Sequence, residues 1–161
     1  MTVTDVRRDA TALTMTITSE FDAPVETAWT LWANPRLLEQ WWGPPTWPAT
    51  FVDHDLSEGG GVTYFMTGPD GERAGGWWKV RTVEAPRLLE FDDGFANDDG
   101  TPNHELPVTT ARVTLAERAG GGTLMVIATT FPSAEAMEQI IAMGMEEGLM
   151  AAMGQMDALL T

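Results

Sequence analysis

The sequence predicts an α+β protein in which a bent antiparallel sheet of about seven strands packs around a long C-terminal helix, with two short helices after the first strand. The first observation is that apolar and polar residues alternate, between turn residues, over most of residues 13–131. The second is the helical spacing of apolar residues over 133–159. Because the apolar face of a sheet needs a cover, we expect this last helix to lie across it and enclose space.

The N-terminal quarter of the chain is expected to contain one strand and two short helices. Residues 1–12 are polar and lack periodicity, so we expect them to be loosely ordered. Residues 13–21 alternate between apolar and polar side chains, which predicts a half-buried strand. Pro24 suits the first position of a helix, and Asn34-Pro35 repeats this start signal. Gly43-Pro44-Pro45 ends the second helix, because neither residue type continues one.

The middle of the chain has the pattern of an antiparallel sheet. Turns that contain glycine or proline separate its apolar segments, as hairpins require. Residues 94–106 form a longer loop within this pattern. We find no repeat, linker or second set of core segments, and therefore expect one domain over residues 1–161. The predicted strands lie near residues 48–56, 61–67, 75–84, 87–93, 107–117 and 123–131.

The predicted C-terminal helix begins after Ser133, a residue type that caps helices well. An uninterrupted helix to residue 159 would span about 40 Å, enough to cross a sheet. Gly144 and Gly148 lie one turn apart on the face turned toward the sheet. Each glycine costs about 1 kcal/mol relative to alanine inside a helix. We therefore expect the pair either to permit a close approach of the backbone or to leave room for a bound molecule.

The charge and composition argue against several classes of function. The chain has 24 acidic and 9 basic residues, a net charge of −15, and Lys79 is its one lysine. Nucleic acid and anionic membrane surfaces both require clusters of basic residues, so we expect neither as a partner. The sequence contains no cysteine for disulfides or thiolate metal sites. We expect a cytoplasmic protein, because no apolar run has the length or flanks of a membrane span or signal peptide.

The 7 tryptophans and 10 methionines favour an apolar interior, and the element order favours a hollow one. Strand alternation and helical spacing assign one set of side chains to the space between sheet and helix. Plain core packing is the alternative for most of them. Tyr64, if buried there, needs a hydrogen-bond partner that a ligand would supply. The predicted cavity residues are Trp42, Val62, Tyr64, Met66, Trp78, Phe91, Met125, Ile127, Met137, Ile141, Met145 and Gly148.

Catalytic and metal-binding motifs are absent from the sequence, which has no serine-nucleophile elbow, no HExxH and no phosphate-binding loop. His54 and His104 are far apart in the sequence, so we expect no metal and no cofactor. Asp92-Asp93 and Asp98-Asp99 lack the spacing of a calcium loop, and we interpret them as a solvated acidic loop. We therefore favour a binding protein over an enzyme, with catalysis by a lone acid in the cavity as the alternative.

Several short motifs, in their order and spacing, resemble one known family. They are Ala23-Pro24 before Trp29, Trp41-Trp42-Gly43-Pro44, Gly59-Gly60 before a strand ending in Met66, Gly68-Pro69-Asp70-Gly71, Pro86 before Leu89 and Phe91, and Gly144-Met145-Glu146-Glu147-Gly148. The family is the one named for the C-terminal domain of the activator of the heat shock protein 90 ATPase, within the START-like (SRPBCC) superfamily. Over residues 13–160 the resemblance implies the helix-grip fold, with a cavity between the sheet and the C-terminal helix.

The resemblance implies that the protein binds a small hydrophobic molecule, because members of this family look mostly like binders of such molecules. A cyclase- or hydrolase-like activity of the wider superfamily is one alternative. Modulation of a chaperone ATPase is another, although this chain has no room for the second domain of the namesake. A homodimer is a further hypothesis, because Met143 and Met150 fall near the helix side opposite Met137 and Gly148. Partial cover of these methionines by neighbouring loops is the alternative.

Overall fold

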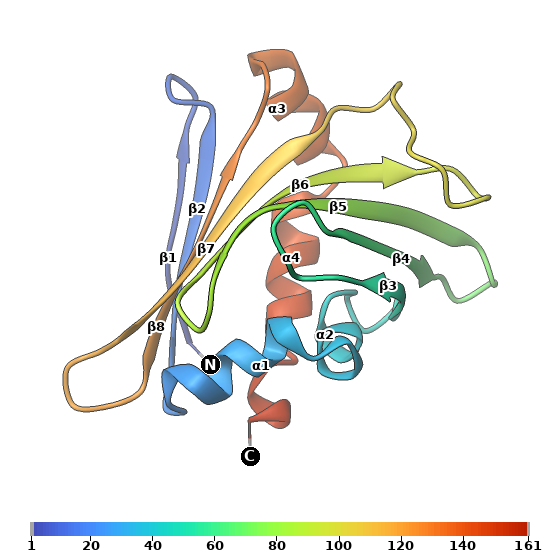
Figure 1. Ribbon diagram of the computed structural model, residues 1–161. Coiled ribbons are helices and arrows are strands. Elements are labelled where there is room, and N and C mark those ends of the chain that lie inside the picture. The colour runs from blue at the N-terminus through green and yellow to red at the C-terminus, as the bar shows by residue number, and fades with distance from the viewer. Residues whose placement is uncertain (1, 161) are drawn as a thin grey trace.

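The computed structural model describes residues 2–160, and its largest element is one antiparallel sheet of eight strands (Figure 1). The strands lie in the order β1-β2-β8-β7-β6-β5-β4-β3, so consecutive strands are neighbours except where β2 pairs with β8. Their bounds are β1 Thr2–Asp9, β2 Thr14–Phe21, β3 Ala49–His54, β4 Gly61–Thr67, β5 Arg73–Glu84, β6 Leu88–Ala96, β7 Thr109–Glu117 and β8 Thr123–Thr130. The predicted α+β class and antiparallel sheet are confirmed.

Residues 2–9 form an edge strand, where the sequence predicts a loosely ordered segment. β1 pairs with β2 along most of its length. Val3 and Val6 pack partly against the core, whereas Arg7 and Arg8 are exposed. Because an edge strand has one neighbour and is held mainly by backbone hydrogen bonds, its side chains need not alternate in polarity, and periodicity misses it. Met1 belongs to the same expected segment but lies outside the described residues.

Two short helices follow β2, as predicted. α1 (Val25–Ala33) buries Trp32, and α2 (Pro35–Trp41) buries Trp41. Asn34 joins them and caps α2, because its side-chain oxygen accepts a hydrogen bond from the Arg36 backbone N–H at 2.9 Å. The indole Nε1–H of Trp41 donates to the carbonyl oxygen of Leu31 at 2.8 Å. This buried bond links the two helices inside the core.

The C-terminal helix, predicted as one element, is interrupted at Gly144. α3 (Ala134–Ala142) begins as expected, with the Ser133 hydroxyl accepting a hydrogen bond from the Ala136 N–H at 3.0 Å. Gly144 has a φ of 89°, and α4 (Met145–Met153) and the 3₁₀ helix η1 (Asp157–Leu159) follow. Glycine tolerates this left-handed conformation, which ends an α-helix and redirects the chain. In Figure 1, α4 crosses the concave side of the bent sheet, with α3 beyond its upper end.

Strand register decides which side chains face α4. Residues opposite each other in an antiparallel pair point to the same side of the sheet. Phe91 is opposite Ala111, and Asp93 is opposite both Trp78 and Thr109. These residues share the concave face, and the buried core lies between this face and the helices. Within residues 2–160, no helix combines the length and hydropathy needed to cross a bilayer.

Candidate functional site

A cavity of about 320 Å³ lies between the concave face of the sheet and the two C-terminal helices. The sheet side of its wall consists of Tyr64, Met66, Phe91, Asp93, Gly94, Phe95, Thr109, Ala111, Ile127 and Thr129. The helical side consists of Ile140, Met143, Gly144, Met145, Gly148 and Leu149, and Trp32, Trp42 and Pro44 complete the wall. Most of these side chains are apolar.

The structure brings together the larger part of the predicted cavity residues. Those that line the cavity are Trp42, Tyr64, Met66, Phe91, Ile127, Met145 and Gly148. Gly148 is the clearest example, because a Cβ added there would meet no atom within 4 Å. Of the two roles that the sequence allows for Gly144 and Gly148, leaving room applies to Gly148. Gly144 instead supplies the left-handed turn between α3 and α4.

The remaining predicted residues lie outside the cavity wall. Val62, Trp78, Met125 and Met137 are buried in the core, and Ile141 is half-buried against it. Alternation identifies the concave face but does not say where that face is covered by other core side chains. The sequence pattern assigns Ile141 to the inner face of one continuous helix, but α3 ends at Ala142, and within α3 its neighbour Ile140 lines the cavity instead.

The same interruption changes the outer helix face on which the homodimer hypothesis rests. Met143 is 55% exposed, but it lines the cavity. Met150 is half-buried and packs against the core. Because α3 and α4 are not one straight helix, the two methionines do not form the exposed face that 3.6-residue periodicity predicts.

Between the sheet and α2, the aromatic rings of the cavity wall pack against one another and against Trp78 in the core behind them. The rings of Trp78 and Phe91 stack with centroids 4.0 Å apart, and Trp42 packs edge-on to Trp78 at 4.9 Å. Trp32 contacts both Trp42 and Phe91, at 5.9 and 6.3 Å. Each ring touches several others, so these side chains have little freedom to move. The result is a rigid, preformed wall on this side of the cavity.

The polar part of the wall centres on Asp93, which the sequence pattern predicts to lie in a solvated acidic loop. This expectation is wrong because β6 continues to Ala96, so strand alternation extends past residue 93. Asp93 then falls in phase with Leu89 and Phe91 on the concave face. The alternation of Leu89, Phe91 and Asp93 is a signal that could have identified it. Asp93 is half-buried, and Thr109 on β7 and Thr129 on β8 are buried in the same wall.

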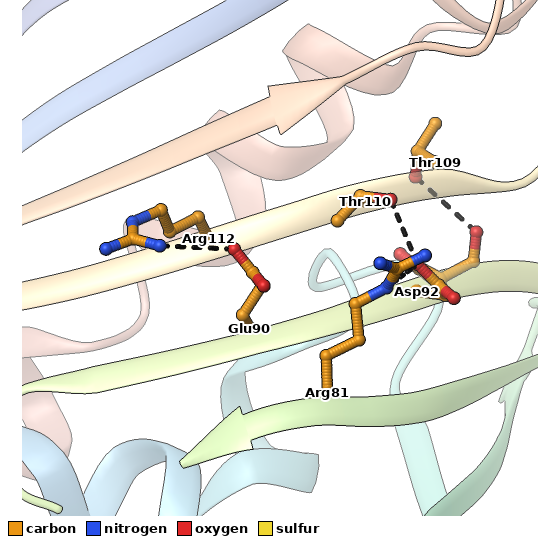
Figure 2. A network of polar contacts seen from close by, with 7 residues as sticks. Arg81, Glu90, Asp92, Thr109, Thr110 and Arg112 are labelled. Atoms are coloured by element: carbon orange, nitrogen blue, oxygen red, sulfur yellow. Dashed lines mark hydrogen bonds and ion pairs between the residues drawn. The ribbon is translucent and has the colours of Figure 1, made fainter. Parts of the chain in front are cut away.

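Asp92, the sequence neighbour of Asp93, points to the convex face and is part of a polar network there (Figure 2). Its Oδ1 accepts hydrogen bonds from the Arg81 Nε–H at 2.7 Å and from the Thr110 hydroxyl at 2.9 Å. Arg112 on β7 also points to this face and pairs with Glu90 at 3.2 Å. The two adjacent aspartates therefore have opposite environments, one paired with arginine and one inside the cavity.

The electrostatics of Asp93 follow from its burial. Burial raises the pKa of its carboxyl to about 7, and a hydrogen bond from Tyr64 opposes this shift. The Tyr64 hydroxyl donates to Asp93 Oδ1 over 3.4 Å, which is long for a bond between two oxygens. The pKa of Tyr64 is raised well above its usual value, first by burial and second by the charge of Asp93. Near neutral pH, Asp93 can therefore exchange a proton.

The described residues offer no counter-ion to Asp93 within the cavity. Asp93 is the one residue of the wall with a charged side chain, and no lysine, arginine or histidine lines it. Across residues 2–160, no group of three or more acidic, histidine or cysteine side chains is arranged to hold a metal ion. The wall thus combines apolar and aromatic side chains with one isolated carboxyl.

The comparisons with known proteins agree with this architecture. The sequence matches the family described as "Activator of Hsp90 ATPase homolog 1-like protein" over residues 22–161. A search of curated proteins finds no match. The crystal structure of Ms6760 from Mycobacterium smegmatis is 52% identical with a TM-score of 0.91, over 99% of this chain and 98% of that one. A solution structure from Arthrobacter aurescens is 53% identical with a TM-score of 0.93, over 99% and 92%.

More distant structures share the fold. The AHSA1 protein from Silicibacter pomeroyi is 20% identical to this chain and has a TM-score of 0.72, over 91% of this chain and 96% of that one. The curved antiparallel sheet, the C-terminal helices across its concave face and the match over residues 22–161 point to one conclusion. The chain belongs to the family of Activator of Hsp90 ATPase homolog 1-like proteins.

Proposed function

We propose that the protein binds a small hydrophobic or amphipathic molecule in the cavity between the sheet and the C-terminal helices. The observation that carries this proposal is a mostly apolar cavity of about 320 Å³ beside a helix whose Gly148 leaves open space. Small-molecule sites are typically apolar clefts of roughly 300–1,000 Å³ with a few polar groups that orient the ligand. An apolar cavity of about 150 Å³ holds one benzene ring, so this one, about twice as large, suits a molecule of two or three rings.

A neutral fluorescent probe tests this proposal. N-phenyl-1-naphthylamine has two ring systems, carries no charge near pH 7 and brightens in apolar surroundings. We expect saturable binding to the wild-type protein, accompanied by a change in tryptophan fluorescence, because Trp32 and Trp42 line the cavity. Native mass spectrometry of freshly purified protein is the companion measurement, since it detects a small molecule that co-purifies.

Variants of Gly148 test whether the probe binds inside this cavity. Gly148→Leu puts a side chain into the open space and should weaken probe binding about tenfold or more, since it removes volume that a ligand must occupy. Gly148→Ala is the matched control and should bind nearly as well as the wild type. Circular dichroism checks that both variants fold. Equal probe binding by the two variants, or no binding by the wild type, would contradict the proposal.

A second candidate is a cyclase- or hydrolase-like activity in which Asp93 acts as a general acid or base. One observation favours it: the carboxyl lies in the cavity wall and burial raises its pKa to about 7, a value suited to proton transfer at neutral pH. Hydrolysis of p-nitrophenyl esters of short apolar acids is a simple test. The rate should follow a titration near pH 7 in the wild type and lose it in Asp93→Asn. Equal rates for both proteins at all pH values would contradict this candidate.

A further inference from the structure

We propose that the ligand of this cavity carries a protonated amine, and that its ammonium group pairs with the carboxylate of Asp93. The inference rests on the proposed binding function and narrows it to a chemical class: a small apolar or aromatic amine. It starts from the position of Asp93, whose side chain belongs to the cavity wall and whose strand register places it on the concave face.

The Asp93 carboxyl makes fewer hydrogen bonds than it can accept. An ionised carboxylate can accept about four hydrogen bonds. From the side chains of the described residues, the Asp93 carboxyl accepts one, from the Tyr64 hydroxyl, and at 3.4 Å it is a long one. Asp92, by contrast, has an arginine at 2.7 Å and a threonine hydroxyl at 2.9 Å. Asp93 therefore has acceptor capacity that faces the cavity and that a donor in a ligand could use.

Asp93 is half-buried in the cavity wall. A carboxylate that is largely removed from water is costly unless a cation pairs with it. No basic side chain lines the cavity among residues 2–160, so the protein does not supply that cation there. An anionic ligand would add repulsion from Asp93 without compensation, and a neutral ligand would leave the carboxylate unpaired. A cationic ligand is the class that completes the site.

Aromatic rings surround the cavity and would also favour a cation. Trp32, Trp42, Tyr64 and Phe91 all contribute to its wall. The faces of aromatic rings attract cations, and tryptophan does so most strongly. An ammonium group beside Asp93 would therefore have both a carboxylate and aromatic rings as neighbours. The apolar part of the same ligand would contact Met66, Ile127 and Leu149. The net charge of −15 attracts cations to the protein as a whole.

Three probes of matched shape test the charge preference: 2-(1-naphthyl)ethylamine, 2-(1-naphthyl)ethanol and 1-naphthylacetate, which are cationic, neutral and anionic. Binding is measured by titration calorimetry at pH 8, where the alkylamine is still protonated. A charge-assisted hydrogen bond is about twice as strong as a neutral one, so we expect the amine to bind about 10- to 100-fold more tightly than the alcohol. The carboxylate should bind most weakly.

Two aspartate variants show which carboxyl causes the preference for the amine over the alcohol. Asp93→Asn keeps the shape of the side chain and removes its charge, and should reduce the amine-to-alcohol ratio to within about threefold of unity. Asp92→Asn removes one negative charge from the convex face, away from the cavity, and should keep the wild-type ratio. This control separates contact with Asp93 from general attraction to an acidic protein. Circular dichroism and the affinity for the neutral alcohol confirm that both variants are folded.

The outcomes separate this inference from the broader proposal. If the alcohol binds, and Gly148→Leu weakens its binding, but the amine has no advantage or Asp93→Asn leaves that advantage intact, the amine inference is wrong and the binding function stands. If none of the three probes binds and the neutral dye does not bind either, the cavity is not a binding site and both proposals fail. An amine advantage lost equally in Asp92→Asn would also overturn the inference.

Discussion

The ring of Tyr64 lies over Gly76, its partner on the neighbouring strand, at a position where no other residue type fits without a shift. The two residues are opposite each other in the pairing of β4 with β5, and a Cβ on Gly76 would overlap the Tyr64 ring and hydroxyl. The missing side chain lets the tyrosine cross β5 and reach Asp93 on β6. A glycine on one strand thus positions the hydroxyl that contacts the cavity carboxyl.

Gly76→Ala should therefore destabilise the protein and displace Tyr64. Overpacking of this kind costs roughly 1–3 kcal/mol of unfolding free energy, which urea denaturation measures. Gly61→Ala, on β4, is the matched control: a Cβ at Gly61 would meet no atom within 4 Å, so this substitution should change stability by less than about 0.5 kcal/mol. Equal effects of the two substitutions would show that the close approach of Tyr64 to Gly76 does not matter for stability.

Asp93→Asn should change how stability depends on pH. Because burial raises the pKa of Asp93 from 3.8 to about 7, the folded protein keeps a proton that the unfolded chain releases in this range. The contribution of Asp93 to stability is therefore present at low pH, falls between about pH 4 and 7, and is constant above. Asparagine does not titrate, so the stability of Asp93→Asn relative to the wild type should rise as the pH increases from about 4 to 7.

One pKa unit corresponds to about 1.4 kcal/mol, and the values 3.8 and about 7 differ by roughly three units, so the variant's gain in unfolding free energy relative to the wild type should be on the order of 4 kcal/mol. Thermal or urea unfolding of both proteins at a series of pH values measures it. Around the carboxyl, the side chains that share its face are Trp78 and Thr109 on the neighbouring strands and Tyr64 on β4, and none of the three is basic. A stability gain of the same size in Asp92→Asn would show that the pH dependence does not arise from the carboxyl in the cavity.

Gly144 and Gly148 should respond in opposite ways to alanine. Gly144 has a φ of 89°, where an alanine costs about 1–2 kcal/mol, so Gly144→Ala should destabilise the protein. Gly148 lies inside α4, where an added Cβ would meet no atom within 4 Å, and Gly148→Ala should stabilise the protein by up to about 1 kcal/mol because alanine favours helix. The unfolding free energies of the two variants, each compared with the wild type, test this difference in sign. Stabilisation by both would mean that α3 and α4 form one continuous helix in solution.

Trp41 and Trp32 should differ when each is replaced by phenylalanine. Both are fully buried, so the lost volume is the same. The Trp41 indole donates to the Leu31 carbonyl at 2.8 Å, whereas the Trp32 indole N–H has no hydrogen-bond partner among the described residues. Trp41→Phe leaves a buried carbonyl unpaired and should cost about 1–3 kcal/mol more than Trp32→Phe. Chemical denaturation measures both, and a larger cost for Trp32→Phe would contradict the role of this bond.

The sequence by itself predicts most of the fold. Alternation in segments such as 61–67 and 123–131 locates the strands of the sheet, because half-buried strands separate apolar from polar side chains at a period of two. It misses β1, since an edge strand is held by backbone hydrogen bonds that leave no pattern in its side chains. Gly144 is visible in the sequence, but whether it stays helical or adopts a positive φ depends on where α4 must pack.

The candidate site depends much more on the tertiary structure. Side-chain chemistry and periodicity are local properties, and they assign Phe91, Ile127 and Gly148 to the right face. Only the tertiary structure separates the residues around the cavity from those that fill the core, such as Trp78 and Met125. It also decides that Asp93 is inside while Asp92 pairs with Arg81 outside. These distinctions arise where strands and helices distant in the chain meet, and a single sequence does not encode those meetings as a local pattern.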